Sequence, residues 1–293
     1  MNCKICGQNN VEVTYEGKIR RGAPGKMTEE DVPVYRCLSC DCIWHEPVIE
    51  SAMLYQSDTY RESMDEVVTL DAFYEKHDDE ILEKLKYTGT SVYRGKLVMD
   101  VGCGGGGYAD YINGVASQIV LVEPAKNFAA QLRNKGYEVF PYMEKALEKY
   151  RNSIEVLTSY DVIEHVDDPE MFLRSVYDLL TPGGTAFIGT PTEYPVLRGL
   201  LGQTFDAFLF SVQHLWVLSR KNLELMAQKS GFSQCKVDYY QRFGLGNLIA
   251  WLQTNTPRGE AKYDFVSRSL DALYKSEMAK EETGEYLVLR LVK

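Results

Sequence analysis

The chain has 293 residues, of which 45% are hydrophobic and 25% charged, a composition typical of a globular protein with a sizeable core. Its 42 acidic against 32 basic residues give a net charge of −10, which disfavours nucleic acid and anionic membranes as partners. The chain lacks an apolar run of the roughly 18 residues that a membrane span needs, and it begins without the apolar core of a signal peptide, so we expect a cytoplasmic protein.

Five of the seven cysteines lie within the first 42 residues. Cys3-Lys-Ile-Cys6 and Cys37-Leu-Ser-Cys40 are two C-x-x-C pairs, a spacing that turns both thiolates of a pair toward one tetrahedral zinc ion. We therefore predict that Cys3, Cys6, Cys37 and Cys40 hold a structural zinc ion, Zn2+. A set of free or redox-active cysteines is the alternative, which a reducing compartment disfavours.

The predicted zinc-ribbon-like module covers residues 1–46. Between the two pairs, Val11 to Tyr15 alternates as a short strand, and a loop containing Gly and Pro follows from Gly17 to Pro33. Cys42 and His45 are possible substitutes for Cys40 as ligands. A module of this size has little core of its own, so we expect its folding to depend on the metal.

Residues 47–90 change to a helical pattern and form the expected helical linker or lid. Apolar and aromatic side chains recur at steps of three or four, which predicts a helix with one packed stripe. The stripe consists of Val67, Leu70, Tyr74, His77, Ile81 and Leu85. We expect His77 to pack within it and not to bind a ligand. Upstream, Leu54 to Arg61 is either a lid segment or a structural linker.

After this helix, strands and helices alternate, which predicts a parallel sheet covered on both faces. Leu97 to Asp100 is the first strand, and the glycine run after it lets the backbone turn sharply and approach a ligand. Gly102, Gly104 and Gly107 also fit the dinucleotide fingerprint G-x-G-x-x-G. The loop could therefore bind either a dinucleotide or a ligand with a cationic group. Asp100 favours the second interpretation, because a carboxylate at the strand end suits a cationic ligand group better than a diphosphate.

The next elements extend this pattern. Gln118 to Val122 is a second strand, and Glu123 follows it 19 residues after Gly104, where nucleotide folds place a carboxylate on the ribose hydroxyls. Pro124 is expected to open a helix that Gly136 closes. Tyr137 to Phe140 is a third strand, and the side chains of Tyr142 and Met143 after it are candidates to cover an adenine face.

The fourth and fifth strands are predicted at Ile154 to Thr158 and at Thr185 to Thr190. Between them, Asp168 is expected to cap a helix that has Pro169 at its first position. Thr181-Pro-Gly-Gly184 then turns the chain into the fifth strand. This order of elements gives an α/β fold in which each strand after the glycine loop is followed by a crossover helix.

Four segments, in this order and spacing, resemble the class I S-adenosylmethionine-dependent methyltransferases. They are Asp100-Val-Gly-Cys-Gly-Gly-Gly106, Glu123, Asp161-Val-Ile-Glu-His165-Val-Asp-Asp-Pro169 and Leu180-Thr-Pro-Gly-Gly184. The resemblance implies a doubly wound, Rossmann-like sheet of seven mostly parallel strands whose last strand is antiparallel. We place that strand at Glu285 to Val292, beside Cys235 to Gln241.

The methyltransferase domain is then expected to cover residues 91–293, with helical insertions at about 191–218 and 243–283. The two cysteine pairs and the segment at Tyr60 also resemble methyltransferases with an N-terminal zinc module, some of which act on nucleotide-linked sugars. The resemblance implies S-adenosyl-L-methionine as the cofactor. The residues expected to bind it are Asp100, Gly102, Cys103, Gly104, Gly106, Glu123, Pro124, Tyr142, Met143, Ser159, Tyr160 and Tyr60.

Transfer of a sulfonium methyl group is an in-line displacement, so positioning alone contributes roughly 7–11 kcal/mol. An oxygen or carbon acceptor must also lose a proton. The candidate bases are His165, His214, Tyr160 and Glu164. We favour His165, because it follows the fourth strand directly and the reference pKa of histidine, near 6.5, suits proton removal at neutral pH.

We predict a methyltransferase for a small-molecule acceptor, for example a nucleotide-linked sugar or a natural-product intermediate. The aromatic residues Phe205, Phe208, Phe210 and Trp216 either wall an apolar acceptor pocket or belong to the core. Two alternatives remain, a nicotinamide-dependent oxidoreductase on the same glycine loop and a non-catalytic zinc-module binding protein. The element methylated (carbon, oxygen or nitrogen) and the oligomeric state stay open.

Overall fold

The computed structural model describes residues 1–48, 69–257 and 261–293. Contacts divide these residues into two compact units. The first unit combines Met1–Val48, Thr190–Leu223 and Val237–Val288, and the second combines the described residues from 69 to Gly189 with Glu224–Lys236 and Leu289–Lys293. Residues 1–46, the expected zinc module, thus share one compact unit with the two expected insertions.

A seven-stranded sheet has the strand order β10-β11-β8-β7-β4-β5-β6. Its strands are β4 (Leu97–Val101), β5 (Gln118–Val122), β6 (Glu138–Phe140), β7 (Ile154–Tyr160), β8 (Leu180–Pro191), β10 (Gln234–Tyr240) and β11 (Tyr286–Val292). The pairs β4–β5, β4–β7, β5–β6 and β7–β8 are parallel. The predicted Rossmann-like sheet is thereby confirmed.

The last strand runs against its neighbour β8. The N–H of Gly183, near the start of β8, donates to the carbonyl of Lys293 just after the end of β11. The N–H of Thr192, just after the end of β8, donates to the carbonyl of Glu285 just before β11 begins. The start of β8 is therefore bonded to the end of β11, and the end of β8 to the start of β11. Strand β11 is thus antiparallel to β8, as expected.

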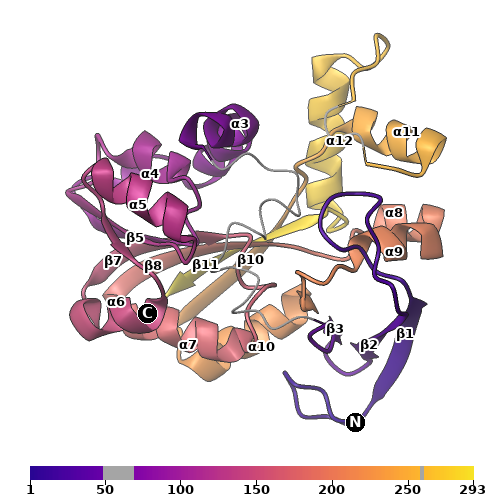
Figure 1. Cartoon of the computed structure of the whole chain (residues 1–293), viewed down its shortest axis with the longest axis horizontal. Helices are drawn as coiled ribbons and strands as arrows, with labels where there is room; N and C mark the ends of the chain where they lie inside the picture. The colour runs from indigo at the N-terminus through magenta and orange to yellow at the C-terminus, as the bar shows by residue number, and fades with distance from the viewer. Residues whose placement is uncertain (49–68, 258–260) are drawn as a thin grey trace. The chain divides into compact units, whose positions relative to one another are not determined.

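Helices cover both faces of the sheet (Figure 1). Helices α3 (Leu70–Thr88), α4 (Gly107–Ile112) and α5 (Lys126–Asn134) lie over one face, and α6 (Met143–Tyr150) and α7 (Pro169–Leu179) lie over the other. Helix α7 begins as predicted, with Pro169 at its first position and the Asp168 carboxylate accepting from the N–H of Met171 at 2.9 Å. Its buried side chains include Phe172, Val176 and Leu179.

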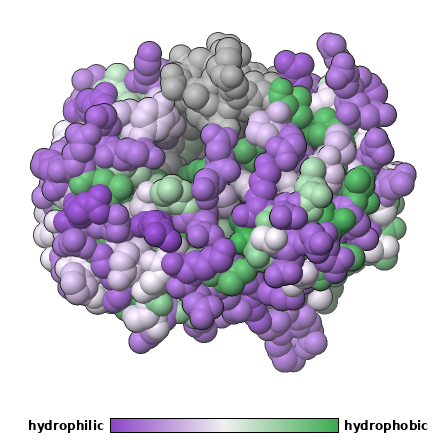
Figure 2. Space-filling view, turned by 90° about the horizontal axis from the view of Figure 1, so that it is seen from below, coloured by the Kyte–Doolittle hydropathy of each residue, from purple (hydrophilic) through white to green (hydrophobic). Residues whose placement is uncertain are grey.

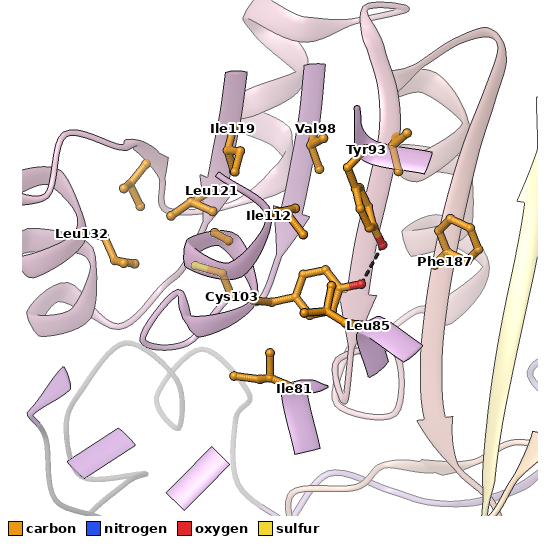
Figure 3. Close-up of a cluster of buried hydrophobic side chains, with 14 of the residues drawn as sticks. Ile81, Leu85, Tyr93, Val98, Cys103, Ile112, Ile119, Leu121, Leu132 and Phe187 are labelled. Atoms are coloured by element: carbon orange, nitrogen blue, oxygen red, sulfur yellow. Dashed lines mark hydrogen bonds between the residues drawn. The ribbon is translucent and has the colours of Figure 1, made fainter. Parts of the chain in front are cut away.

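The core on the α3 side of the sheet is drawn in Figure 3. Ile81 and Leu85 of α3 are buried together with residues of β4 and β5, such as Val98 and Leu121. Each such aliphatic side chain contributes about 1.5–3 kcal/mol when fully buried. The predicted stripe is thus confirmed for its second half, and Val67 lies outside the described residues.

Three boundaries differ from the sequence-based expectation. Helix α5 begins at Lys126 with Ala125 as its cap, so Pro124 precedes the helix and does not open it. Strand β7 continues to Tyr160. The segment Leu180 to Gly184 is already part of β8, because Leu180 pairs with Ile154 before the register shifts. A Cβ at Gly184 would lie 3.0 Å from the Ile154 carbonyl oxygen, so any other residue would be crowded there. This crowding explains why position 184 is a glycine.

The first unit contains a second, four-stranded sheet of order β1-β2-β3-β9. Its strands are β1 (Val11–Gly17), β2 (Val32–Cys37), β3 (Ile43–His45) and β9 (Trp216–Val217), and all its pairs are antiparallel. Ile43 of β3 pairs with Val217 of β9. The N-terminal strands therefore depend on a partner strand that lies within the predicted insertion.

The core of the first unit draws on both parts of the chain. Ile19, Val34 and Ile43 are buried against Phe210 and Val217. A second cluster contains Tyr194, Leu197, Phe205 and Trp251, with Phe208 packed against it. Phe205, Phe208, Phe210 and Trp216 thus belong to the core or its margin, and the structure favours this interpretation over an acceptor pocket.

Helices make up the rest of the two insertions. They are α8 (Pro195–Leu201), α9 (Gln203–Leu209), α11 (Leu245–Thr254) and α12 (Arg268–Lys280), and α10 (Arg220–Ser230) lies between the insertions. The face seen in Figure 2 is mostly hydrophilic, with hydrophobic residues in scattered groups. In the described ranges, no helix combines the length and the apolar character needed to cross a lipid bilayer.

Candidate functional site

The glycine loop joins β4 to α4. Gly102, Gly104 and Gly106 have φ values of 72°, 55° and 77°, the left-handed region that favours glycine. A Cβ at Gly102 would lie 2.3 Å from Cγ2 of Val162, and one at Gly106 would lie 2.5 Å from Cδ2 of Leu132. These two glycines are therefore needed for close packing as well as for the turn.

Helix α3 packs directly on this loop. A Cβ at Gly105 would lie 2.6 Å from Cδ1 of Phe73, and one at Gly107 would lie 2.6 Å from Cδ1 of Ile81. The Tyr74 hydroxyl donates to the Gly105 carbonyl at 3.0 Å. The loop is thus fixed from outside by α3, a role that the spacing of the helix stripe did not reveal.

Glu123 lies immediately after β5 and is only 4% exposed. The N–H of Gly104 donates to Oε2 and the N–H of Ala125 donates to Oε1, both at 2.8 Å. The carboxylate is therefore held rigidly beside the glycine loop. An ionised carboxylate offers about four acceptor sites, and these two hydrogen bonds use one on each oxygen. Glu123 fits the predicted role at a ribose.

Asp100 lies at the carboxyl end of β4 and is 3% exposed. The Thr158 hydroxyl donates to its Oδ1 at 2.7 Å. Burial raises the pKa of Asp100 to about 6, against the opposing effects of the Thr158 hydrogen bond and the positive charge of Lys84. The carboxyl group is therefore charged above about pH 6, where it can attract a cationic ligand group.

Lys84 of α3 is a functional candidate that the sequence did not identify. Its Nζ lies 3.0 Å from Oδ2 of Asp161 and 2.8 Å from Oε1 of Glu80. Nζ also lies 5.0 Å from the centre of the Tyr160 ring, within cation–π range. A lysine three residues after Ile81, on the packed face of the helix, is the signal that could have revealed it.

The side chains of two predicted cofactor-binding residues, Cys103 and Ser159, lie within the fold, and their contact with the cofactor stays a prediction. Cys103 belongs to the hydrophobic cluster of Figure 3, where its side chain lies among apolar residues. Ser159 is fully buried in β7, and its hydroxyl donates to the Val101 carbonyl at 3.0 Å. Because strand β7 extends past Thr158, Ser159 pairs within the sheet and does not lie in the loop that follows the strand.

The remaining predicted ligands lie around the ends of β5 and β6. Pro124 is half-buried beside Glu123. Tyr142 is 40% exposed and precedes α6, while Met143 is the buried first residue of that helix. These placements are compatible with covering a ligand face. Tyr60, with the rest of the segment from Leu54 to Arg61, lies outside the described residues.

The candidate bases differ in their surroundings. His165 lies in the turn after β7, where its N–H donates to the Val162 carbonyl at 2.9 Å. Its Nε2 lies 4.0 Å from Oε1 of the fully buried Glu164, and its side chain is 13% exposed. Burial, and the nearby phenol of Tyr93, raise the pKa of Tyr160 well above its ordinary value, which argues against Tyr160 as a base.

His214 belongs to the first unit, whereas His165, Tyr160 and Glu164 belong to the second. The backbone N–H of His214 donates to the Ser211 carbonyl at 3.1 Å, in the turn that precedes β9. His214 thus has a defined position within its own unit. Its candidacy as a base stays a prediction.

The four predicted zinc ligands come together in the first unit. The Sγ atoms of Cys3 and Cys40 are 3.6 Å apart, those of Cys6 and Cys37 are 3.5 Å apart, and all four lie within 4.8 Å of one another. A tetrahedral zinc ion with Zn–S bonds of about 2.3 Å needs S···S separations of about 3.8 Å. The cluster therefore fits a single structural zinc ion.

The two cysteine pairs have the same local backbone geometry. Gly7 and Asp41 each follow the second cysteine of a pair, with φ values of 75° and 60°. The N–H of Gly7 donates to the Cys3 carbonyl at 2.9 Å, and the N–H of Asp41 donates to the Cys37 carbonyl at 2.8 Å. Aspartate tolerates the left-handed region better than most residues, so both turns close in the same way.

The two possible substitutes for Cys40 have other roles. Cys42 is a buried thiol outside the group of four. His45 is also buried, and its Nε2 lies 2.9 Å from the Ser211 carbonyl oxygen and 3.0 Å from that of His214. Both ring nitrogens are engaged, since Nδ1 lies 2.8 Å from the Glu46 carbonyl oxygen.

The segment after β9 also contacts the cysteine module. The Ser219 hydroxyl and the Asn222 amide donate to the Cys40 carbonyl at 3.3 and 3.2 Å. The His45 contacts, the β3–β9 pairing and these two hydrogen bonds all connect residues 211–222 to the cysteine module. The four-cysteine cluster and this segment therefore form one structural region.

Comparison with known proteins places the chain in a family. A family model described as a methyltransferase domain matches residues 73–236, more than half of the chain, so the chain belongs to this family. It is 27% identical over 226 residues to the mitochondrial ubiquinone biosynthesis O-methyltransferase of Mus musculus, covering 70% of this chain and 60% of that protein. It is 29% identical over 138 residues to the ubiquinone biosynthesis O-methyltransferase of Coxiella burnetii, covering 44% and 54% respectively.

The chain thus spans only about half to three fifths of the length of these relatives. Among solved structures, a SAM-dependent methyltransferase from Archaeoglobus fulgidus matches with a TM-score of 0.52 at 14% identity, covering 75% of this chain and 98% of that one. This likeness concerns the fold. The chain therefore carries a methyltransferase domain with the fold of that SAM-dependent methyltransferase, and the nicotinamide-dependent alternative loses its support.

Proposed function

We propose that the protein transfers the methyl group of S-adenosylmethionine to a hydroxyl oxygen of a small-molecule acceptor. The observation that carries this proposal is the pair of buried carboxylates, Asp100 and Glu123, at the carboxyl ends of two adjacent parallel strands. Val101 and Val122 pair directly beside them. The glycine loop lies between the two acids, and ligands bind at this edge of open α/β sheets.

The two acids suit different parts of the donor. Asp100 is charged above about pH 6 and suits a cationic group, while the Glu123 carboxylate, held beside the glycine loop by the N–H of Gly104, suits the hydroxyl groups of a ribose as donors. When bound, S-adenosylmethionine supplies a methyl group on a sulfonium centre, which is electrophilic. The protein then has to orient the acceptor, exclude water and remove one proton.

An oxygen acceptor is favoured because the curated relatives are named O-methyltransferases. We assign His165 as the base that takes the hydroxyl proton, with the buried Glu164 beside it. A positioned base typically contributes a factor of 10² to 10⁴ in rate. A nucleotide-linked sugar or a natural-product intermediate with a free hydroxyl would both satisfy this chemistry.

We also propose that the four cysteines bind one structural zinc ion. The support is the set of Sγ separations and the matching turns at Gly7 and Asp41. Zinc has no redox chemistry, and a site closed by four cysteines has no open position for substrate. The ion would therefore stabilise the first unit and take no part in methyl transfer.

A thermal-shift panel tests the proposed activity. We expect S-adenosylmethionine and S-adenosylhomocysteine to raise the melting temperature, and NAD and NADP to leave it unchanged. A shift with NAD or NADP and none with the two sulfur ligands would overturn the proposal. A screen of hydroxylated acceptors with methyl-labelled donor then identifies the substrate, and label recovered only on carbon or nitrogen would contradict an oxygen acceptor.

A further inference from the structure

The Tyr74 hydroxyl of α3, which donates to the Gly105 carbonyl at 3.0 Å, has a second partner. Its oxygen accepts a hydrogen bond from Nζ of Lys135 at 2.8 Å. An ammonium group can only donate, so Lys135 occupies the acceptor side of the phenol and leaves the single phenol proton for Gly105. Burial raises the pKa of Tyr74, so this proton is present at neutral pH. The hydrogen bond therefore has one direction, from α3 to the glycine loop.

Two further side chains fix Lys135. It is the C-cap residue of α5, and its Nζ forms an ion pair with Oδ2 of Asp110 in α4. The other carboxylate oxygen of Asp110 accepts from the Tyr137 hydroxyl at 2.7 Å. A chain of hydrogen bonds therefore runs from Tyr137, just before β6, through Asp110 and Lys135 to Tyr74. It connects α3, α4 and α5 to one carbonyl group of the glycine loop.

The carbonyl of Gly105 shares a peptide group with the N–H of Gly106. That N–H donates to the Cys103 carbonyl at 2.9 Å. Both ends of the peptide group are therefore bonded, one to α3 and one within the loop. A peptide group between two glycines can rotate at little steric cost, because glycine adopts positive and negative φ about equally readily. The Tyr74 hydroxyl therefore supplies a restraint that the loop sequence itself lacks.

The Tyr74 bond acts beside a second restraint. The N–H of Gly104 donates to the Glu123 carboxylate, so the loop is held from β5 at one residue and from α3 at the next. A ligand that binds to a backbone already in place loses less conformational entropy than one that must order the backbone on binding. The hydroxyl of Tyr74 is thus placed to affect ligand affinity without touching the ligand.

We propose that Tyr74 is a positioning residue for donor binding, whose hydroxyl, oriented by Lys135, holds the peptide group of Gly105 and Gly106 in the conformation that receives S-adenosylmethionine. This inference rests on the proposed function, because it takes the glycine loop as the donor site. Loss of the hydroxyl should free the peptide group in the ligand-free protein and weaken donor binding. Loss of the Lys135 ammonium should act in the same direction but less strongly, because the phenol proton is then no longer directed to Gly105 alone.

The test combines two measurements on the full chain. Calorimetry gives the affinity for S-adenosylhomocysteine, and hydrogen exchange of the Gly106 amide reports the loop in the ligand-free protein. Tyr74→Phe removes only the hydroxyl and keeps the ring, and it should weaken binding about three- to tenfold, the value of one neutral hydrogen bond. Exchange at Gly106 should become faster by a similar factor. Lys135→Met is the second variant, which decides the question if Tyr74→Phe folds poorly.

Tyr111→Phe is the matched control, because Tyr111 lies on α4 with 44% of the residue exposed. It should leave affinity and Gly106 exchange unchanged. A double-mutant cycle separates the two roles in the chain of hydrogen bonds. In a Tyr74→Phe background, Lys135→Met should cause no further loss of affinity, because Lys135 acts on the loop through the Tyr74 hydroxyl.

A Tyr74→Phe protein that is less stable but has wild-type affinity and wild-type Gly106 exchange would overturn the proposal, since Tyr74 would then only stabilise the fold. Equal losses of affinity from Lys135→Met in the presence and absence of the Tyr74 hydroxyl would overturn the role of Lys135. If S-adenosylhomocysteine fails to bind the wild type, the proposed function fails, whereas Gly106 exchange in the ligand-free protein still decides whether Tyr74 holds the loop.

Discussion

The four-cysteine cluster and the glycine loop are the two proposed ligand sites, and the chain shapes them by different means. In the cluster, every ligand atom comes from two short segments with the same turn geometry, closed by Gly7 and Asp41. In the loop, the backbone is fixed by side chains from other elements, such as Phe73 and Ile81 of α3 and Leu132 of α5. The proposed zinc ion would complete the cluster, whereas packing and hydrogen bonds within the chain hold the loop.

This difference predicts opposite responses to loss of ligand. Removal of zinc should unfold the region around the cysteines, because four thiols 3.5–4.8 Å apart have no other reason to converge. Removal of S-adenosylmethionine should leave the glycine loop in place, because its hydrogen bonds to Glu123 and Tyr74 do not involve the ligand. Four experiments test this contrast, in decreasing order of expected effect.

The largest effect is expected from Cys3→Ser combined with Cys6→Ser. Structural zinc contributes about 10–16 kcal/mol in zinc-finger peptides, so the variant should lose its metal and the order of residues 1–45. Hydrogen exchange should also increase in residues 211–222, which His45 and β3 hold, while β4 and β5 stay protected. Elemental analysis should find one zinc per wild-type chain.

Two controls sharpen the metal prediction. Cys40→Ser should lose zinc, whereas Cys42→Ser should keep it, because Cys42 lies outside the group of four. Wild-type protein without zinc after purification in the absence of chelators would contradict the proposed site. Retention of zinc by Cys40→Ser would return Cys42 or His45 to the ligand set.

The second-largest effect is expected for catalysis, at His165 in the unit that contains the glycine loop. His165→Ala should lower kcat by about 10² or more while donor affinity changes little, because a base acts on the acceptor proton. The acid limb of the pH–rate profile should disappear with it. His214→Ala is the companion variant, and a wild-type kcat for His165→Ala with the acid limb intact would move the role to His214.

The third effect separates stability from binding. The pKa of Asp100 is about 6 in the folded protein against an ordinary value of 3.8, so the folded state holds this proton more tightly than the unfolded state. Stability therefore decreases as the pH rises from about 4 to about 6, and the full cost at neutral pH is about 3 kcal/mol. Asp100→Asn should remove this cost and raise the free energy of unfolding at pH 7, while weakening donor binding.

Urea unfolding at about pH 4 and about pH 7 measures this third effect, since the two values bracket the proton release of Asp100. Asp178→Asn, at an exposed ion pair with Arg151, should change stability by less than about 1 kcal/mol. A loss of stability for Asp100→Asn at neutral pH would show that the carboxylate stabilises the ligand-free fold, contrary to the burial argument.

The smallest effect is expected at Glu123. Glu123→Gln keeps the shape of the side chain but replaces one acceptor oxygen by an amide donor, so donor affinity should fall about tenfold, the value of one hydrogen bond to a charged group. Glu123→Ala should in addition destabilise the loop, because the N–H groups of Gly104 and Ala125 lose their acceptor. Unchanged calorimetric affinity in both variants would remove Glu123 from the donor site.

The sequence predicts well those features that depend on residues near one another in the chain. The strands that end at Asp100 and Glu123, the cap at Asp168 and both cysteine pairs are of this kind, because hydrophobic pattern, glycine and cysteine spacing act locally. Parallel strands then bring their carboxyl ends to one edge, so the proximity of Asp100 and Glu123 also follows from the pattern.

Features that depend on tertiary packing could not be predicted in this way. The two-residue strand β9 is too short to leave a pattern, and its pairing with β3 depends on the whole first unit. Lys84 looks like an ordinary surface lysine until α3 is docked, since its partner Asp161 is 77 residues away in sequence. The environment of the Cys103 and Ser159 side chains also depends on packing, because Cys103 lies in the hydrophobic cluster and the Ser159 hydroxyl donates to the Val101 carbonyl. Their role in cofactor binding stays a prediction.

The pairing of Ile43 with Val217 has a consequence during synthesis of the protein. Strand β3 leaves the ribosome before its partner strand β9, which is translated about 170 residues later, and at about 5–20 residues per second this takes roughly 10–35 s. During that interval β3 has an open edge and the apolar side chain of Ile43 lacks its cover. Early zinc binding would hold the nascent segment in its folded turns. In a cell short of zinc, newly made chains should therefore aggregate first. Protein that is already folded should lose methyl transfer only later.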